Sequence, residues 1–104
     1  MAVRSGEQFL EGLRRSPPNL YVDGVRVLDP AAHPATGAAA RAIAELYDLQ
    51  LRPDLLEGMT FAGADGARFG MSFLEPSTVD DLRRRSRMHR TWARHSLGFI
   101  GRSP

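Results

Sequence analysis

The side chains that most often carry chemistry are few in this chain, and the three histidines come first. His33 stands before Pro34 in a loop with no second histidine near it, which favours a turn or capping residue over a metal ligand. His89 and His95 lie six positions apart on a predicted helix, so their side chains face different directions. The sequence therefore predicts no catalytic residue and no metal site.

Arginine is the other chemically capable residue, because all 14 basic side chains are arginine. Four of them fall on one side of a helix predicted over residues 78–97, at spacings of four, three and four: Arg83, Arg87, Arg90 and Arg94. One interpretation is a solvated face that acidic neighbours partly neutralise. The other is a surface that follows the phosphates of a nucleic acid.

Composition limits the function classes further. With 104 residues and 42% hydrophobic content, the chain suits one globular domain with a modest core. It has no cysteine, which excludes disulfides, thiolate catalysis and thiolate metal ligands. It shows no glycine-rich phosphate loop and no supported serine–histidine pair, so no cofactor-binding residue is predicted. A net charge of +2 does not by itself indicate nucleic acid, and without an apolar leader or spanning run we expect a cytoplasmic protein.

The longest predicted helix, residues 78–97, has clear start and stop signals. Ser77 and Thr78 are the cap candidates, acidic residues fill the first turn, and Gly98 can end the helix in a left-handed conformation. We expect its apolar face to consist of six residues, with Trp92 at the edge: Val79, Leu82, Ser86, His89, Ala93 and Leu97.

Three polar side chains of this helix take their expected roles from that face. Arg85 projects near Trp92 and His89 on the apolar side. A buried guanidinium needs a carboxylate or an aromatic ring beside it, so we expect an ion pair or a stacking role for Arg85. His89 is expected to be half-buried, and His95 to lie on the surface.

Shorter elements precede this helix. Ser5 and Gln8 have the spacing of a capping box, which predicts a helix over residues 5–15 that ends before two prolines. An Asp-Gly pair between two β-rich runs is typical of a type I′ turn and predicts a hairpin over residues 20–28. A looser alternation with several glycines predicts a second hairpin over residues 59–74.

An alanine-rich helix is predicted over residues 35–51. Its main apolar face is expected to contain five residues: Ala39, Ala42, Ile43, Leu46 and Leu49. Further apolar residues, among them Ala40 and Ala44, widen that face, so the helix needs cover on two sides. Tyr47 is expected to be a core or interface residue with its hydroxyl hydrogen-bonded. The predicted fold is mainly α with two short β-hairpins, in a single module of residues 1–104.

Several short motifs occur along the chain in one order: Tyr21-Val-Asp-Gly24, Arg26-Val27, His33-Pro34, Ala44-Glu-Leu-Tyr-Asp-Leu49, Asp81-Leu-Arg-Arg-Arg85, Trp92-Ala93 and Gly101-Arg-Ser-Pro104. This ordered set resembles the N-terminal region of the 4-hydroxyphenylacetate 3-monooxygenase family, the oxygenase components of two-component flavin systems. The resemblance covers essentially the whole chain but only a minor N-terminal part of a typical member. It implies the small helical N-terminal module of an acyl-CoA-dehydrogenase-like flavin monooxygenase.

The resemblance also implies a reaction. A separate reductase supplies reduced FAD, the oxygenase forms a flavin hydroperoxide, and a phenol is hydroxylated ortho to its hydroxyl. In that family the arginine of the Gly-Arg-Ser/Thr-Pro loop, which matches Arg102, lies near the substrate phenol. A fixed cation there lowers the pKa of the phenol and makes its ring more electron-rich. The alternative role for Arg102 is to anchor the loop.

Much of the family pattern is not in this sequence. Members continue past Pro104 through an aspartate and a tyrosine that helps to hold the phenol. They then add a flavin-binding β domain and a C-terminal bundle with the tetramer interface. Because the reaction needs a dry, closed pocket, we expect the isolated chain to be inactive and to bind no cofactor. The tetramer interface of the family implies that the full enzyme is a homo-oligomer. A related branch carries an iron–sulfur cluster on cysteines, which this chain lacks.

Two further functions fit the residues without any resemblance. A non-catalytic interaction or oligomerisation module would use the excess apolar surface to dock on a partner or on itself. An arginine-rich nucleic-acid binder would use the basic side of the last helix. The lack of aromatic residues among those arginines argues against binding of single strands.

Overall fold

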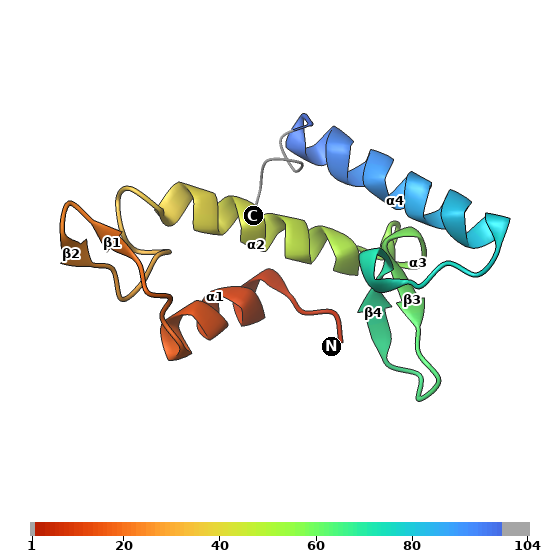
Figure 1. The fold of residues 1–104 in the computed structure, drawn as a ribbon, viewed down its shortest axis with the longest axis horizontal. Coiled ribbons are helices and arrows are strands. Elements are labelled where there is room, and N and C mark those ends of the chain that lie inside the picture. Colours follow the sequence, from red (N-terminus) through yellow and green to blue (C-terminus); the bar gives the residue numbers. More distant parts are fainter. Residues whose placement is uncertain (1, 99–104) are drawn as a thin grey trace. The chain divides into compact units, whose positions relative to one another are not determined.

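The computed structural model describes residues 2–98 and shows a mainly helical fold with two small antiparallel strand pairs, which confirms the predicted fold class (Figure 1). The α-helices are α1 (Gly6–Arg15), α2 (Gly37–Leu51), α3 (Leu56–Met59) and α4 (Val79–Ser96). The strands are β1 (Tyr21–Val22), β2 (Val25–Arg26), β3 (Thr60–Ala62) and β4 (Arg68–Gly70), and a 3-10 turn, η1 (Met71–Phe73), follows β4.

The chain divides into two compact units. One consists of Arg4–Leu49 and contains α1, α2 and the β1–β2 hairpin. The other combines Met1–Val3 with Gln50–Pro104 and contains α3, the β3–β4 hairpin and α4. That residues 1–104 act as a single module stays a prediction.

In the first unit, α1 and α2 meet at a close backbone approach. The N–H of Gly6 donates a hydrogen bond to Asp48 Oδ1 at 2.7 Å. The Phe9 and Tyr47 rings stack with their centres 4.9 Å apart, and Arg4 Nη2 donates to the Tyr47 hydroxyl at 3.2 Å. Tyr47 is therefore a packing residue with a satisfied hydroxyl, as predicted.

The predicted main face of α2 is partly wrong. Leu49 is buried and Ile43 and Leu46 are half-buried, as expected, but Ala39 and Ala42 are exposed. Ala40 and Ala44, which were expected only to widen the face, are buried. The reason is Gly6 of α1, which lets that helix approach the Ala44 backbone directly and so cover the side of α2 that carries Ala40 and Ala44. Counting apolar residues on one helix cannot reveal which side its neighbour reaches.

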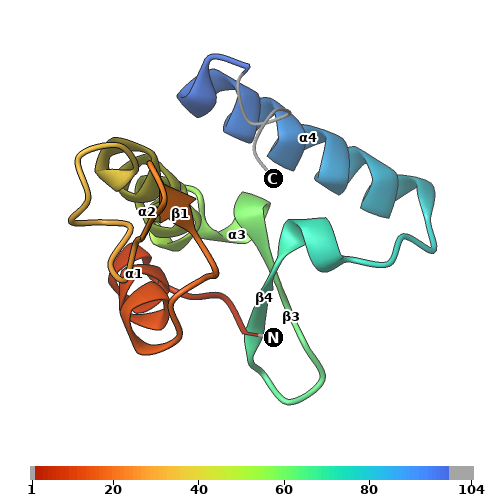
Figure 2. The same ribbon diagram turned by 60° about the vertical axis from the view of Figure 1, so that its left-hand side comes forward.

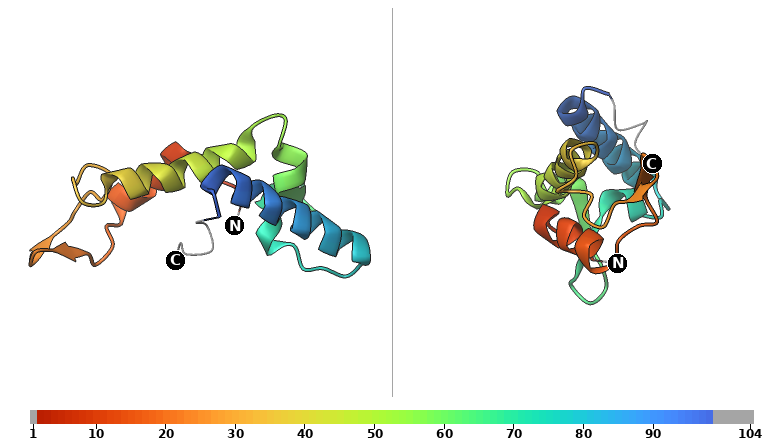
Figure 3. Two further views of the ribbon diagram at one scale, coloured as in Figure 1. Left: turned by 90° about the horizontal axis from the view of Figure 1, so that it is seen from above. Right: turned by 90° about the vertical axis from the view of Figure 1, so that its left-hand side faces the viewer.

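The β1–β2 hairpin forms at the predicted place. Its register pairs Tyr21 with Arg26 and Val22 with Val25. Asp23 and Gly24 have φ of 51° and 78°, the left-handed pair that a type I′ turn requires. Figure 3 shows the hairpin extending beyond the helices of its own unit, and both Tyr21 and Val25 are exposed, so it adds little to the core.

Three methionines form the core of the second unit. Met59 at the end of α3, Met71 in η1 and Met88 in α4 are each only 1% exposed. The predicted second hairpin lies beside them, with Phe61 paired to Phe69 across β3 and β4. The N-terminal segment runs along this hairpin, where Val3 N–H donates to the carbonyl of Arg68 at 2.9 Å (Figure 2).

The predicted apolar face of α4 is also wrong. Val79, Leu82 and Leu97 are exposed, and the side that packs carries Met88 and Trp92. One long, flexible methionine that reaches the buried cluster outweighs a longer row of apolar residues that meets nothing in this unit.

The polar residues of α4 follow from this orientation. His89 is exposed rather than half-buried, which corrects the prediction, whereas His95 is exposed as expected. Arg85 is half-buried, and among residues 2–98 it makes neither an ion pair nor a ring contact, so its predicted role has no support within that range.

Two glycines of α1 provide a matched test of the close approach. A Cβ at Gly6 would lie 2.7 Å from Asp48 Oδ2 and even nearer the carbonyl oxygen of Ala44, whereas one at Gly12 would meet only Arg4 Nη1 at 3.8 Å. We expect Gly6→Ala to destabilise the fold by about 1–3 kcal/mol because backbone must shift. Gly12→Ala should stabilise it by up to about 1 kcal/mol. Thermal unfolding followed by circular dichroism checks this, and shifts of Tm in the same direction would contradict it.

Candidate substrate-binding element

The predicted substrate-binding residue, Arg102, lies outside the described residues. The structure describes the helix that leads to it, α4, and the turn after that helix as far as Gly98. The described part of the candidate site therefore consists of the contacts that hold α4 in place and the side chains exposed on its surface.

The start of α4 is fixed by one carboxylate. Asp81 Oδ2 accepts hydrogen bonds from the N–H groups of Ser77 and Thr78 at 3.1 and 3.2 Å and from the Ser77 hydroxyl at 3.2 Å. In return, the Thr78 hydroxyl accepts from the N–H of Asp81 at 3.1 Å, which completes a capping box. The hydrogen bond from the Ser77 backbone, followed by those from Thr78 and the Ser77 side chain, holds the pKa of Asp81 below its ordinary value.

The end of α4 turns left-handed one residue earlier than predicted. The helix ends at Ser96, and both Leu97 and Gly98 have positive φ, 52° and 80°. The N–H of Gly98 donates to the carbonyl of Ala93 at 2.9 Å, which closes the last turn. Gly98 takes the expected conformation, but the sequence did not show that Leu97 shares it. The chain thus leaves α4 in a defined direction shortly before Arg102.

The basic side of α4 is solvated, but it is not neutralised. Arg83, Arg87, Arg90 and Arg94 are all exposed. Within the described part of the chain none of the four forms an ion pair with a carboxylate, although Asp80 lies three residues before Arg83 on the same helix. By contrast, Arg84 on the packed side lies 3.5 Å from Asp81 Oδ1. Four adjacent cations without local partners are available to something outside this unit.

His33 caps a loop, as predicted. Its Nδ1 accepts a hydrogen bond from the N–H of Ala35 at 3.0 Å, just before α2 begins. Among residues 2–98, no group of three or more histidine, aspartate or glutamate side chains converges on a possible metal position. Nothing in that region crosses a membrane as a long apolar helix.

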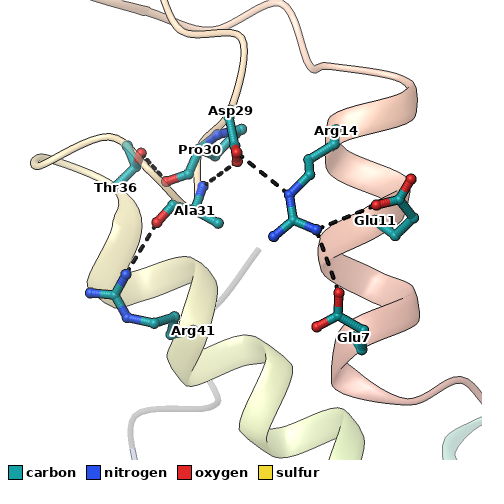
Figure 4. A network of polar contacts seen from close by, with 8 residues as sticks. All are labelled: Glu7, Glu11, Arg14, Asp29, Pro30, Ala31, Thr36 and Arg41. Atoms are coloured by element: carbon teal, nitrogen blue, oxygen red, sulfur yellow. Dashed lines mark hydrogen bonds and ion pairs between the residues drawn. The ribbon is translucent and has the colours of Figure 1, made fainter.

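The loop around His33 is held by a network that sequence reasoning missed (Figure 4). Arg14 Nε lies 3.5 Å from Asp29 Oδ2, and its Nη1 lies 3.3 Å from Glu11 and 3.5 Å from Glu7. The hydrogen bond with Glu11, with further contributions from Asp29 and Glu7, raises the pKa of Arg14 above its ordinary value. The spacing of the acidic residues from Arg14 on one helix was the available signal.

The same network orders the start of α2. Asp29 Oδ1 accepts from the N–H of Ala31 at 3.1 Å, and the Thr36 hydroxyl donates to the carbonyl of Pro30 at 2.7 Å. Arg41 Nη1 reaches back from α2 to the carbonyl of Ala31 at 3.1 Å. These contacts are structural, since each dashed contact in Figure 4 joins two groups of the same unit.

A family model described as 4-hydroxyphenylacetate 3-hydroxylase N terminal matches residues 5–104. The chain belongs to this family. It is 45% identical over 102 residues to the 4-hydroxyphenylacetate 3-monooxygenase oxygenase component of Thermus thermophilus, covering 98% of this chain and 21% of that protein. It is 40% identical to the oxygenase component of a 4-nitrophenol 4-monooxygenase/4-nitrocatechol 2-monooxygenase from Rhodococcus opacus, covering 98% of this chain and 19% of that protein.

Solved structures agree with this assignment. A crystal structure of a 4-hydroxyphenylacetate 3-monooxygenase oxygenase component with FAD and 4-hydroxyphenylacetate matches 97% of this chain and 21% of that one, with 44% identity and a TM-score of 0.91. An archaeal 4-hydroxybutyryl-CoA dehydratase from N. maritimus matches 88% of this chain and 18% of its own, with 27% identity and a TM-score of 0.69. The chain spans about a fifth of the length of the relatives that it matches.

Asp81 gives a pH-dependent prediction. Because its pKa is lower in the folded chain than in the unfolded chain, its stabilising effect is fully present above the unfolded pKa of about 3.9 and is lost as the pH falls toward the folded pKa. Asp81→Asn should therefore be less stable than the wild type above about pH 5, and the difference should shrink below about pH 4. Asp80→Asn, in the same turn, is the control. Urea unfolding across this pH range decides, and a pH-independent difference for Asp81→Asn would overturn the argument.

Proposed function

We propose that this chain is the N-terminal part of a reduced-FAD-dependent monooxygenase that hydroxylates a phenolic substrate ortho to its hydroxyl. The observation that carries the proposal is the match, over 97% of the chain, to an oxygenase component bound to both FAD and 4-hydroxyphenylacetate. Relatives named for different phenols share the same N-terminal region, so the substrate class is a phenol and the individual phenol is left open.

The proposed contribution of this chain is to position Arg102. The Asp81 cap and the burial of Met88 fix both the start and the rotation of α4, and the left-handed turn at Leu97 and Gly98 directs the chain that follows. A guanidinium delivered in this way would stabilise the phenolate and raise the electron density of the ring at the ortho carbon. Reduced FAD, when bound, would react with molecular oxygen, one atom of which is transferred to the ring while the other leaves as water.

The groove described along α1 does not fit a flavin. The open groove of about 420 Å³ along α1 has a mixed lining: Arg4, Glu7, Gln8, Glu11, Gly12 and Arg15. Carboxylates beside the cations would repel a pyrophosphate, so no cofactor contact is assigned to this groove. The flavin contacts are therefore proposed to come from the rest of the enzyme, and the isolated chain is proposed to be inactive. A separate flavin reductase, a homo-oligomeric enzyme and a cytoplasmic location complete the proposal.

A FAD titration tests the division of labour between this chain and the rest of the enzyme. We expect no binding by the isolated chain. We expect binding and ortho hydroxylation of 4-hydroxyphenylacetate or another phenol by a chimera, defined as this chain joined to the remaining four-fifths or so of the Thermus thermophilus oxygenase component. Reduced FAD is supplied and the product is identified by mass spectrometry and NMR. A folded chimera that binds FAD but hydroxylates none of a panel of phenols would contradict the proposed function.

The role of Arg102 is tested in the same chimera. Arg102→Gln should lower kcat/KM about 100-fold, since one preorganised charge is lost, and should shift the pH–rate profile to higher pH because the phenol then ionises without help. Arg15→Gln, an exposed arginine on α1, is the matched control and should leave both unchanged. If Arg102→Gln lowers the thermal stability and raises KM but does not shift the pH–rate profile, the residue merely anchors its loop.

A further inference from the structure

The outward side of α4 carries two parallel rows of side chains. The first, here called the apolar row, consists of Val79, Leu82, Ser86, His89, Ala93 and Leu97. Its large members are strongly exposed: Val79 by 64%, Leu82 by 57% and Leu97 by 85%. The second, the basic row, consists of Arg83, Arg87, Arg90 and Arg94. Both rows point away from the methionine core, because Met88 lies on the opposite side of the helix.

The spacing of the apolar row is that of a seam between two helices. From Val79 to Ala93 its members follow one another at intervals of three, four, three and four, which is the repeat of positions that face a neighbouring helix. Ser86 and Ala93 are small and alternate with larger residues, so a second helix backbone could approach closely there.

The basic row indicates that the surface that covers this seam is negatively charged. Elsewhere in the described residues four arginines form ion pairs with carboxylates (Arg14, Arg52, Arg68 and Arg84) and five do not (Arg4, Arg15, Arg26, Arg41 and Arg85). The basic row differs from these because its four guanidinium groups, without an ion pair among the described residues, are adjacent on one exposed side of a helix and lie beside exposed apolar side chains. Carboxylates on the covering surface would complement them.

We propose that the apolar and basic rows of α4 dock an acidic, apolar-faced helix in the part of the oxygenase polypeptide that lies beyond the region this chain covers. The inference deepens the proposed function and rests on it, since it assumes a full-length oxygenase. Two observations select this occupant: the relatives are about five times as long as this chain, and the exposed charge is of one sign. The partner helix places apolar side chains against Leu82 and its neighbours, and aspartates or glutamates beside Arg83 and Arg90.

The charges argue against a second copy of this chain. At the seam, Arg83 and Arg90 flank one edge and Arg85 the other. An antiparallel copy would bring the Arg83 edge against itself, and a parallel copy would bring it against Arg85, so either arrangement sets guanidinium groups together. A nucleic acid would meet the basic row but leave the apolar row uncovered, and Trp92, the aromatic residue of α4, lies on the packed side.

Thiol labelling tests the docking directly, because the chain has no cysteine of its own. Leu82→Cys reports on the apolar row, and His95→Cys, which is exposed and outside both rows, is the matched control. Cysteines native to the Thermus portion are replaced by serine. In the isolated chain both thiols should react with a maleimide at similar rates. In the chimera Leu82→Cys should react at least 10-fold more slowly and His95→Cys at an unchanged rate; equal rates for Leu82→Cys in both proteins would overturn the proposal. Ser86→Cys repeats the measurement if Leu82→Cys does not fold.

A charge reversal tests the acidic character of the partner. The double variant Arg83→Glu/Arg90→Glu, introduced into the Leu82→Cys chimera at about 0.1 M salt, should restore at least part of the lost labelling rate and lower the Tm of the chimera. It should leave the Tm of the isolated chain nearly unchanged, because neither guanidinium forms an ion pair within residues 2–98. No effect in the chimera would sink the claim of an acidic partner.

The remaining outcomes are also decisive. Slow labelling of Leu82→Cys in the isolated chain at high concentration, with dimers in sedimentation, would mean that a second copy occupies the face. Binding of DNA or RNA by the isolated chain at low salt, abolished by the double reversal, would assign the basic row to nucleic acid. A chimera that is protected at Leu82→Cys but hydroxylates no phenol would support the docking and contradict the proposed function. An active chimera in which Leu82→Cys is not protected would support the proposed function and contradict the docking.

Discussion

Three methionine side chains determine which side of α4 is buried and which sides are exposed. Met59, Met71 and Met88 come from three different elements and are almost completely buried against one another. Their long, unbranched side chains reach across irregular space that branched residues would fill poorly. Because Met88 is the one fully buried residue of α4 among those described, it sets the rotation of the helix. That rotation turns both the apolar and the basic row away from the methionine core.

The local signals in the sequence were sufficient wherever structure depends on near neighbours. The capping boxes at Ser5 and Thr78, the Asp-Gly turn and the capping role of His33 each involve partners within four residues, and all are present. Short-range hydrogen bonds of this kind need little help from the rest of the fold. The helix boundaries followed from them to within a few residues.

Facing directions were not predictable in the same way. The covered side of α2 depends on Gly6, which lies far away in the sequence, and the covered side of α4 depends on Met59 and Met71. Hydrophobic periodicity reports that a side of a helix is apolar, but not which partner reaches it. For the candidate site, the same limit hid the absence of ion pairs along the basic row among the described residues, whereas Arg102 was found only through the family resemblance.

The incorrect face of α4 is itself informative. Periodicity identified an apolar face of α4, and within its own unit this face packs against no other element. Exposing several large apolar side chains on one helix is unfavourable for an isolated small domain. The proposed docking explains both the burial of Met88 and the exposure of the apolar row. Met88 packs against other residues of this chain, and the apolar row would pack against the rest of the oxygenase. The orientation of Arg102 would then depend on two opposite sides of one helix, each held by a different part of the protein.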